Sequence, residues 1–206
     1  MQVFCPSKTI AVLALCFGLL TPLTVSAKEA DAGAFVNELS REAAIKLGSA
    51  GLTKAQKEEN FRQLFHVAFD VPAISRFVLG KYWRSASEAE KQDFTAAFEE
   101  LQMQHFLPKF AQYDQDSVKV ESVEAESGKP DMYKVSSKIA YGEGEPAAVV
   151  WRIRDTGESY KILDVVAEGV SMAISLRHEY GEIAKTQGVD GLIKQMRDKS
   201  SELAAQ

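Results

Sequence analysis

The chain is poor in the side chains that bind metals or attack substrates. It has two cysteines, Cys5 and Cys16, and both lie near the N-terminus. Its three histidines, His66, His105 and His178, have no complete ligand set at metal-binding spacing beside them. We therefore expect no metal site and no cofactor and, once the N-terminal segment is removed, no disulfide and no thiol nucleophile.

The chain also lacks a basic excess and a glycine-rich phosphate loop. It carries 24 lysines and arginines against 29 aspartates and glutamates, a net charge of −5. Nucleic-acid binding is not supported, because a protein that neutralises phosphates needs surplus cations. The net charge does not favour adsorption to an anionic membrane surface either.

Long hydrophobic runs are absent. The longest, from Ile10 to Leu20, is well short of the ~20 residues that span a bilayer. Lys8 precedes it, and Val25-Ser26-Ala27 follows it as an A-x-A-like cleavage site. We expect residues 1–27 to be a secretory signal peptide and residues 28–206 to form a single domain. A domain of that length buries roughly 70% of the surface that its unfolded chain exposes.

Residues 31–110 show helical periodicity divided by capping signals. Thr53 with Gln56, and Ser87 with Glu90, have the spacing of capping boxes, and Asp70 precedes a proline in the next first turn. The expected helices cover residues 31–47, a segment after Thr53, residues 73–79, and a long helix after Ser87 that bends or ends near Pro108.

The second half of the chain predicts a sheet followed by two helices. Apolar and polar residues alternate in four segments, beginning near residues 118, 133, 146 and 160 and joined by turns. Beyond Gly169 the apolar pattern becomes helical, with a break near Gly188. The expected fold class is α+β, a four-stranded antiparallel sheet whose apolar face is covered by several helices.

Two catalytic interpretations compete with structural ones. Ser171 lies between a strand and a helix, as a nucleophile elbow requires, but His178 follows too closely to complete a triad. A helix N-cap explains Ser171 more simply. Asp164 and Glu168 could act with His105 as the acid–base groups of a secreted enzyme. Alternatively, they accept hydrogen bonds from backbone amides or arginines.

The aromatic side chains fall on helices and strands that should face one another. Core packing explains most of them, but a single layer of helices over a strongly apolar sheet can also leave a cavity for an apolar ligand. The converging set is Tyr82, Trp83, Phe94, Phe98, Phe106, Phe110, Tyr133 and Trp151.

Three blocks resemble one family. FDVPAISRFVLGKYWR over residues 69–84 is similar to the FD…LG..WR signature of the MlaC, or toluene-tolerance, family. WRI over residues 151–153 and YKILDVVAEGVS over residues 160–171 are similar to its W.I…Y.I.DV..EG.S block. The blocks come in the family's order, and the resemblance covers the chain from about Asp31 to its last helix.

The resemblance implies a monomeric periplasmic carrier rather than an enzyme. Such carriers hold a phospholipid, here with two acyl chains, and shuttle it between an outer-membrane lipoprotein–porin complex and an inner-membrane ABC transporter complex. They thereby maintain outer-membrane lipid asymmetry. A hopanoid-associated carrier and a ligand-free adaptor remain alternatives. We expect the lipid to contact Phe98, Leu101, His105, Phe106, Phe110, Tyr133, Ile139, Val149, Trp151, Val170, Ser171 and Met172, with free amides at the helix start near Ser171 facing the headgroup phosphate.

Overall fold

The computed structural model describes residues 27–49, 51–110, 117–140 and 144–205. Nearly all of the expected signal peptide, residues 1–26, lies outside the described residues, as does the side chain of Phe110. Within the described ranges, no helix has the length and apolar character needed to span a membrane.

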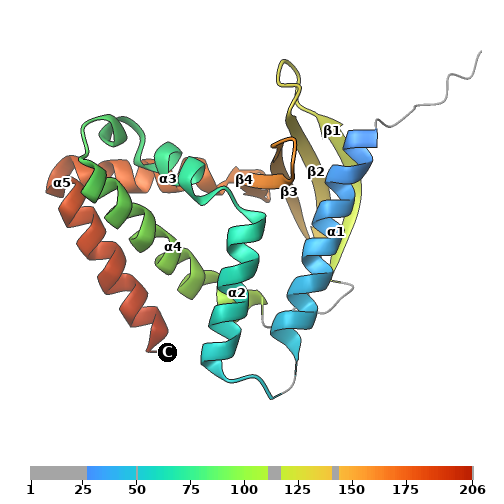
Figure 1. Cartoon of the computed structure of the whole chain (residues 1–206), viewed down its shortest axis with the longest axis horizontal. Coiled ribbons are helices and arrows are strands. Elements are labelled where there is room, and N and C mark those ends of the chain that lie inside the picture. Colours follow the sequence, from blue (N-terminus) through green and yellow to red (C-terminus); the bar gives the residue numbers. More distant parts are fainter. Residues whose placement is uncertain (1–26, 50, 111–116, 141–143, 206) are drawn as a thin grey trace, which may run out of the picture.

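Helices cover one face of a single sheet (Figure 1). The helical elements are α1 (Ala27–Gly48), α2 (Lys54–Ala68), α3 (Val71–Leu79), the 3₁₀ turn η1 (Gly80–Arg84), α4 (Glu88–Phe110) and α5 (Met172–Ala204). The strands are β1 (Val118–Ala125), β2 (Met132–Ile139), β3 (Ala147–Asp155), β4 (Tyr160–Ala167) and β5 (Val170–Ser171).

The capping signals that the sequence predicts are confirmed, whereas α1 begins at Ala27 instead of residue 31. The Thr53 side chain accepts a hydrogen bond from the Gln56 amide, and the Gln56 side chain accepts one from the Thr53 amide. Ser87 and Glu90 make the same reciprocal pair ahead of α4. Asp70 accepts a hydrogen bond from the Ala73 amide at 3.0 Å, so α3 begins at Val71, slightly earlier than expected, with a proline in its first turn.

The sheet confirms the expected α+β class and differs in one strand. Its order is β1-β2-β3-β4-β5, and each neighbouring pair is antiparallel, so the chain forms a meander. The expected sheet has four strands, whereas the structure adds β5, only two residues long. Val166 pairs with Ser171, so the chain turns after β4 and pairs back with it just before α5 begins. The short return strand fixes the start of α5 against the sheet edge.

One face of the sheet is covered mainly by α1. Tyr133, Val135 and Ile153 are buried on this face, whereas Lys134 and Lys138 of β2 lie on the opposite face and are exposed. The buried side chains pack with Ala32 and Val36 of α1 in one apolar cluster. Gly33 permits the close approach, because a Cβ atom there would lie 3.0 Å from Val123 of β1.

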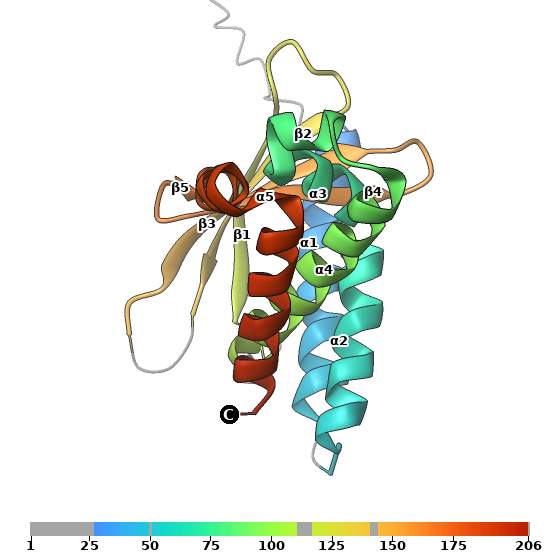
Figure 2. The same cartoon turned by 90° about the vertical axis from the view of Figure 1, so that its left-hand side faces the viewer.

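A second apolar cluster lies among the helices on the other side of the molecule. It joins α3, α4 and α5 through buried residues that include Phe94, Phe98, Tyr180 and Leu192. Figure 1 shows α2 between this helical layer and the pair formed by α1 and the sheet. The break expected near Gly188 is a kink inside α5, where φ is 72° and ψ is 178°, and the two halves of α5 run in different directions (Figure 2).

Candidate functional site

A cavity of about 440 Å³ separates the sheet from the helical layer. Such a volume lies within the range of ordinary small-molecule pockets. Its walls come from β2, β3 and β4 on one side and from α2, α3, α4 and α5 on the other. The lining residues, mostly apolar, are Phe61, Phe65, Phe69, Ile74, Phe98, Gln102, Phe106, Lys109, Ile139, Ala147, Val149, Trp151, Leu163, Asp164, Val165, Ala167, Met172, Ala173 and Leu176.

The sheet wall is held by the strand ladder and by two hydrogen bonds of the Ser137 side chain. Val149 pairs with Ala167, and Trp151 pairs with Val165, so these four side chains lie on the same face of the sheet. The Trp151 indole N–H donates to the Ser137 hydroxyl at 2.9 Å. Because that hydroxyl in turn donates to the Val149 carbonyl oxygen, the indole ring is fixed in the wall.

A β-bulge adds a further side chain to this wall. In the pairing of β3 with β4, Arg152 lies opposite Asp164 and Ile153 lies opposite Ile162, so Leu163 is the extra residue. Ile162 is fully buried in the cluster under α1, whereas Leu163 lines the cavity. One strand therefore supplies both the core and the cavity.

The helix wall is aromatic. Phe61 and Phe65 of α2 and its C-cap residue Phe69 form an aromatic row, with ring centroids 6.2 Å apart for the first pair and 4.7 Å apart for the second. Phe98 of α4 packs edge-on against Tyr180, which is buried in the helical cluster. Burial raises the pKa of the Tyr180 phenol, so that hydroxyl stays protonated.

Six of the residues expected to contact lipid line the cavity. They are Phe98, Phe106, Ile139, Val149, Trp151 and Met172.

Five other expected residues lie outside the lining. Leu101 packs against the helical cluster, and Tyr133 is buried beneath α1. His105 is exposed, Val170 is 59% exposed, and Ser171 caps α5. The remaining expected residue, Phe110, has its side chain outside the described part of the chain.

The sequence signal for the missed wall was present. The spacing of Phe61, Leu64, Phe65 and Ala68 predicts a core-facing helix stripe, and all four are buried. Two of them, Phe61 and Phe65, also border the cavity. A buried stripe and a cavity wall have the same periodicity, so only the three-dimensional arrangement separates them.

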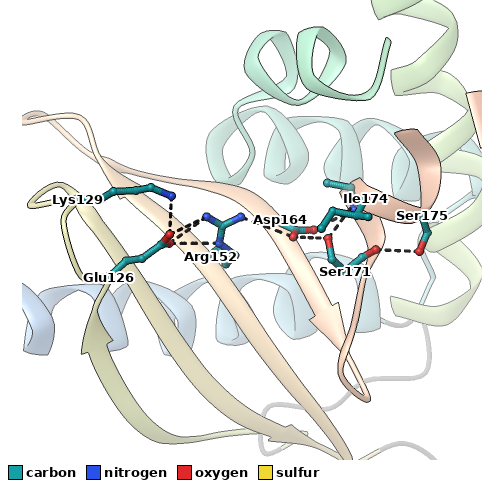
Figure 3. Close-up of polar contacts among 8 residues, drawn as sticks. Glu126, Lys129, Arg152, Asp164, Ser171, Ile174 and Ser175 are labelled. Atoms are coloured by element: carbon teal, nitrogen blue, oxygen red, sulfur yellow. Dashed lines mark hydrogen bonds and ion pairs between the residues drawn. The ribbon is translucent and has the colours of Figure 1, made fainter. Parts of the chain in front are cut away.

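The polar residues near the start of α5 form hydrogen bonds that stabilise the fold (Figure 3). Asp164 accepts hydrogen bonds from the Ser171 hydroxyl at 2.6 Å and from the Ala173 amide at 3.0 Å. The Ser171 hydroxyl accepts one from the Ile174 amide at 3.1 Å, as an N-cap does. The expectation of free amides at this helix start is therefore wrong for Ala173 and Ile174, because the protein's own side chains occupy them.

An arginine continues this polar chain across the sheet. Arg152 lies 4.0 Å from the Asp164 carboxylate and forms hydrogen bonds to Glu126, which also pairs with Lys129. The Lys129 and Arg152 cations hold the pKa of the Glu126 carboxyl below its usual range.

Nothing in this geometry assembles an acid–base pair with His105. The Asp164 carboxylate is occupied as described, and Glu168 is exposed and accepts a hydrogen bond from the Ala148 amide at 2.6 Å. His105 contacts Lys109 instead, at 2.8 Å. Partial burial and the Lys109 charge lower the pKa of His105. Among the described residues, no cluster of three or more His, Cys, Asp or Glu side chains could hold a metal ion.

An α+β domain with a mostly apolar cavity between its sheet and its helices defines a class of proteins that bind apolar ligands. The family model for the MlaC protein matches residues 40–198. The chain belongs to the MlaC family, as the sequence resemblance predicts.

Two curated relatives are similar over part of their length. The "Intermembrane phospholipid transport system binding protein MlaC" of Haemophilus influenzae is 28% identical over 128 residues, which are 61% of this chain and 59% of that protein. The "Toluene tolerance protein ttg2D" of Pseudomonas putida is 23% identical over 122 residues, which are 59% of this chain and 56% of that protein. The chain thus spans less than two thirds of the length of these relatives.

A solved structure shares the fold. The phospholipid-binding protein from Ralstonia solanacearum, determined in complex with a phospholipid, matches with a TM-score of 0.75 and 17% sequence identity. The match covers 84% of this chain and 98% of that protein.

Proposed function

We propose that this protein carries a phospholipid, with the acyl chains in the cavity between the sheet and the helices. The observation that carries the proposal is the cavity itself, about 440 Å³ in volume and lined mostly by apolar side chains. Membership of the MlaC family supports it, and so does a neighbour of the same fold whose structure contains a phospholipid.

The energetics explain why such a cavity is needed. Exposing two acyl chains of about sixteen carbons to water costs about 25 kcal/mol, at ~0.8 kcal/mol per methylene. A carrier must therefore shield most of both chains. Because a membrane interior is about as apolar as the cavity, extraction gains little net free energy. Direction therefore comes from the partners.

We infer the partners and the location from membership of the family. The carrier would operate in the periplasm, after removal of residues 1–27 as a signal peptide, and would act as a monomer. It would exchange lipid with an inner-membrane ABC transporter complex and an outer-membrane lipoprotein–porin complex, and so maintain outer-membrane lipid asymmetry. The relative named for intermembrane phospholipid transport supports this role, and the occupied carboxylates Asp164 and Glu168 favour a carrier over an enzyme.

Mass spectrometry of co-purified lipid tests the proposal. The full chain is exported in a bacterial host, recovered from the periplasm without detergent, and extracted. We expect about one phospholipid per protein. Hopanoid in its place would leave the cavity as the ligand site and change the class of ligand. A protein that is empty, and stays empty after incubation with phospholipid vesicles, would overturn the carrier function in favour of an adaptor.

A further inference from the structure

The two charged side chains that line the cavity differ in exposure and in their partners. Among the lining residues that the structure describes, Lys109 is the one cation and Asp164 is the one carboxylate. Asp164 is buried and takes hydrogen bonds from the Ser171 hydroxyl and the Ala173 amide. Lys109 is exposed and forms no ion pair with a carboxylate in the described part of the chain. The cavity therefore offers an anion one free positive charge.

Two neighbours on the last turns of α4 hold this lysine. Its ammonium group lies 2.8 Å from His105 Nε2 and 5.1 Å from the centroid of the Phe106 ring. The Phe106 ring lines the cavity and packs edge-on against the imidazole of His105. Because an ammonium only donates, His105 Nε2 accepts, which places the ring proton of a neutral imidazole on Nδ1. The ammonium keeps N–H donors for a ligand.

Lys91, on the same helix, shows what a fully paired lysine looks like. Its ammonium lies over the Trp83 ring at 5.9 Å, much as Lys109 lies over Phe106, but it also pairs with Glu88 at 2.7 Å. Lys91 does not line the cavity. The two lysines thus share a helix and an aromatic contact, and differ in the carboxylate partner and in the position.

We propose that Lys109, held by His105 and Phe106 at the edge of the cavity, binds the phosphodiester of the carried lipid's headgroup. This inference rests on the proposed carrier function and names the ligand group that the cavity selects. A phosphodiester has one negative charge and unesterified oxygens that accept hydrogen bonds from an ammonium. With the acyl chains against the apolar walls, the headgroup would lie at the C-terminal end of α4, away from the capped start of α5.

The test compares a lipid with a phosphate and one without. Binding of phosphatidylglycerol and of diacylglycerol with the same acyl chains is measured by competition against a fluorescent lipid. In Lys109→Met, we expect phosphatidylglycerol to bind about tenfold more weakly or worse, because a charge-assisted hydrogen bond is lost. Binding of diacylglycerol should be unchanged. Lys91→Met should change neither, and Lys109→Arg should retain the preference for phosphatidylglycerol.

The outcomes separate the two proposals. If the wild-type protein binds both lipids and Lys109→Met weakens both equally or neither, the headgroup site is overturned and the carrier function stands. If the wild-type protein binds neither lipid, both proposals fail. Inorganic phosphate alone, titrated into the protein while the His105 ring resonances are followed by NMR, distinguishes the source of the anion. Saturable binding of free phosphate at millimolar or lower concentration would overturn the lipid assignment.

Discussion

Val149 and Trp151, on the sheet side of the cavity, belong to one continuous hydrogen-bonded ladder, whereas the aromatic side chains opposite come from separate helices. Each sheet position is fixed by pairing on both sides. Phe65 and Phe98 are fixed only by the packing of α2 and α4. The sheet wall has a set shape, and the helix wall can adjust by small shifts between helices.

The two walls also belong to different apolar clusters, so a substitution in each wall affects a different part of the core. A change in the sheet wall alters the cavity but leaves the helical cluster intact, because β3 belongs to the cluster under α1. A change in the helix wall affects the helical cluster instead, since Phe98 belongs both to the cavity lining and to the cluster of α3, α4 and α5. Val149 and Trp151 likewise belong both to the cavity lining and to the cluster under α1, so ligand binding and stability are coupled in both walls.

The largest effect is expected from a charge placed in the sheet wall. Val149→Arg puts a guanidinium in the apolar cavity, where an uncompensated charge is costly, and should abolish lipid co-purification. Val150→Arg is the matched control, because the neighbouring residue points to the opposite face of the strand. Lipid is quantified by mass spectrometry after circular dichroism has confirmed folding.

Should Val149→Arg fail to fold, a neutral variant keeps the test. Ala147→Phe fills cavity volume from the same strand without adding charge. Ala148→Phe places the same side chain on the exposed face of the strand and serves as its control. Retention of full lipid content by a folded Val149→Arg or Ala147→Phe protein would remove the sheet wall from the binding site.

A truncation in the helix wall should mainly cost stability. Phe98 is 2% exposed, and Phe98→Ala should lower the free energy of unfolding by about 3–5 kcal/mol, because a large buried side chain is lost from the helical cluster. The folded fraction should still bind lipid, in a larger cavity. Urea denaturation and lipid content are measured together, and unchanged stability with lost lipid would contradict the comparison.

A smaller effect sharpens the description of the sheet wall. Ser137→Ala leaves the buried Trp151 indole N–H without its acceptor and should cost about 1–3 kcal/mol of unfolding free energy. Trp151→Phe removes the donor, so it carries the cost of lost volume without a stranded polar group. Chemical denaturation of both, and of the double variant, gives the coupling energy. Additive costs would show that the hydrogen bond does not fix the ring.

The smallest effect is a shift in the titration of His105. Partial burial and the Lys109 charge lower its pKa, so the NMR midpoint should lie below the ordinary value of about 6.5. Between the two values the unfolded chain binds more protons. The stability contribution of this group is therefore complete above about pH 6.5 and is lost as the pH falls toward the folded-state pKa. Lys109→Met should raise the midpoint, and an unmoved midpoint would exclude the charge as a cause.

The sequence predicts the meander well because alternation and turn residues are local signals. Val149 and Trp151 line the cavity as their strand pattern implies, and the caps at Thr53 and Asp70 lie where their residue types predict them. The two-residue strand β5 is not predictable in the same way. It is too short to show a period, and its pairing depends on where β4 and α5 meet.

The candidate site is less predictable because neighbouring residues of α4 lie in three different environments. Leu101 packs against the helical cluster, Phe106 lines the cavity, and His105 between them is exposed, although the sequence predicts lipid contact for all three. A helical period defines which side is apolar and not what lies against it. Lys109 carries no apolar signal at all, so its place in the lining follows only from how α4 packs.

The strand order of the sheet also bears on how the chain acquires its shape. Every strand pairs with the one just before it, so each step closes only a short loop and costs little entropy. Local pairing of this kind favours fast folding. The unfolded chain can therefore build β1 to β4 as successive hairpins, and the cavity between the sheet and the helices is complete only when α5 docks. Pulse-labelled amide exchange during refolding should show β3 protected before α5.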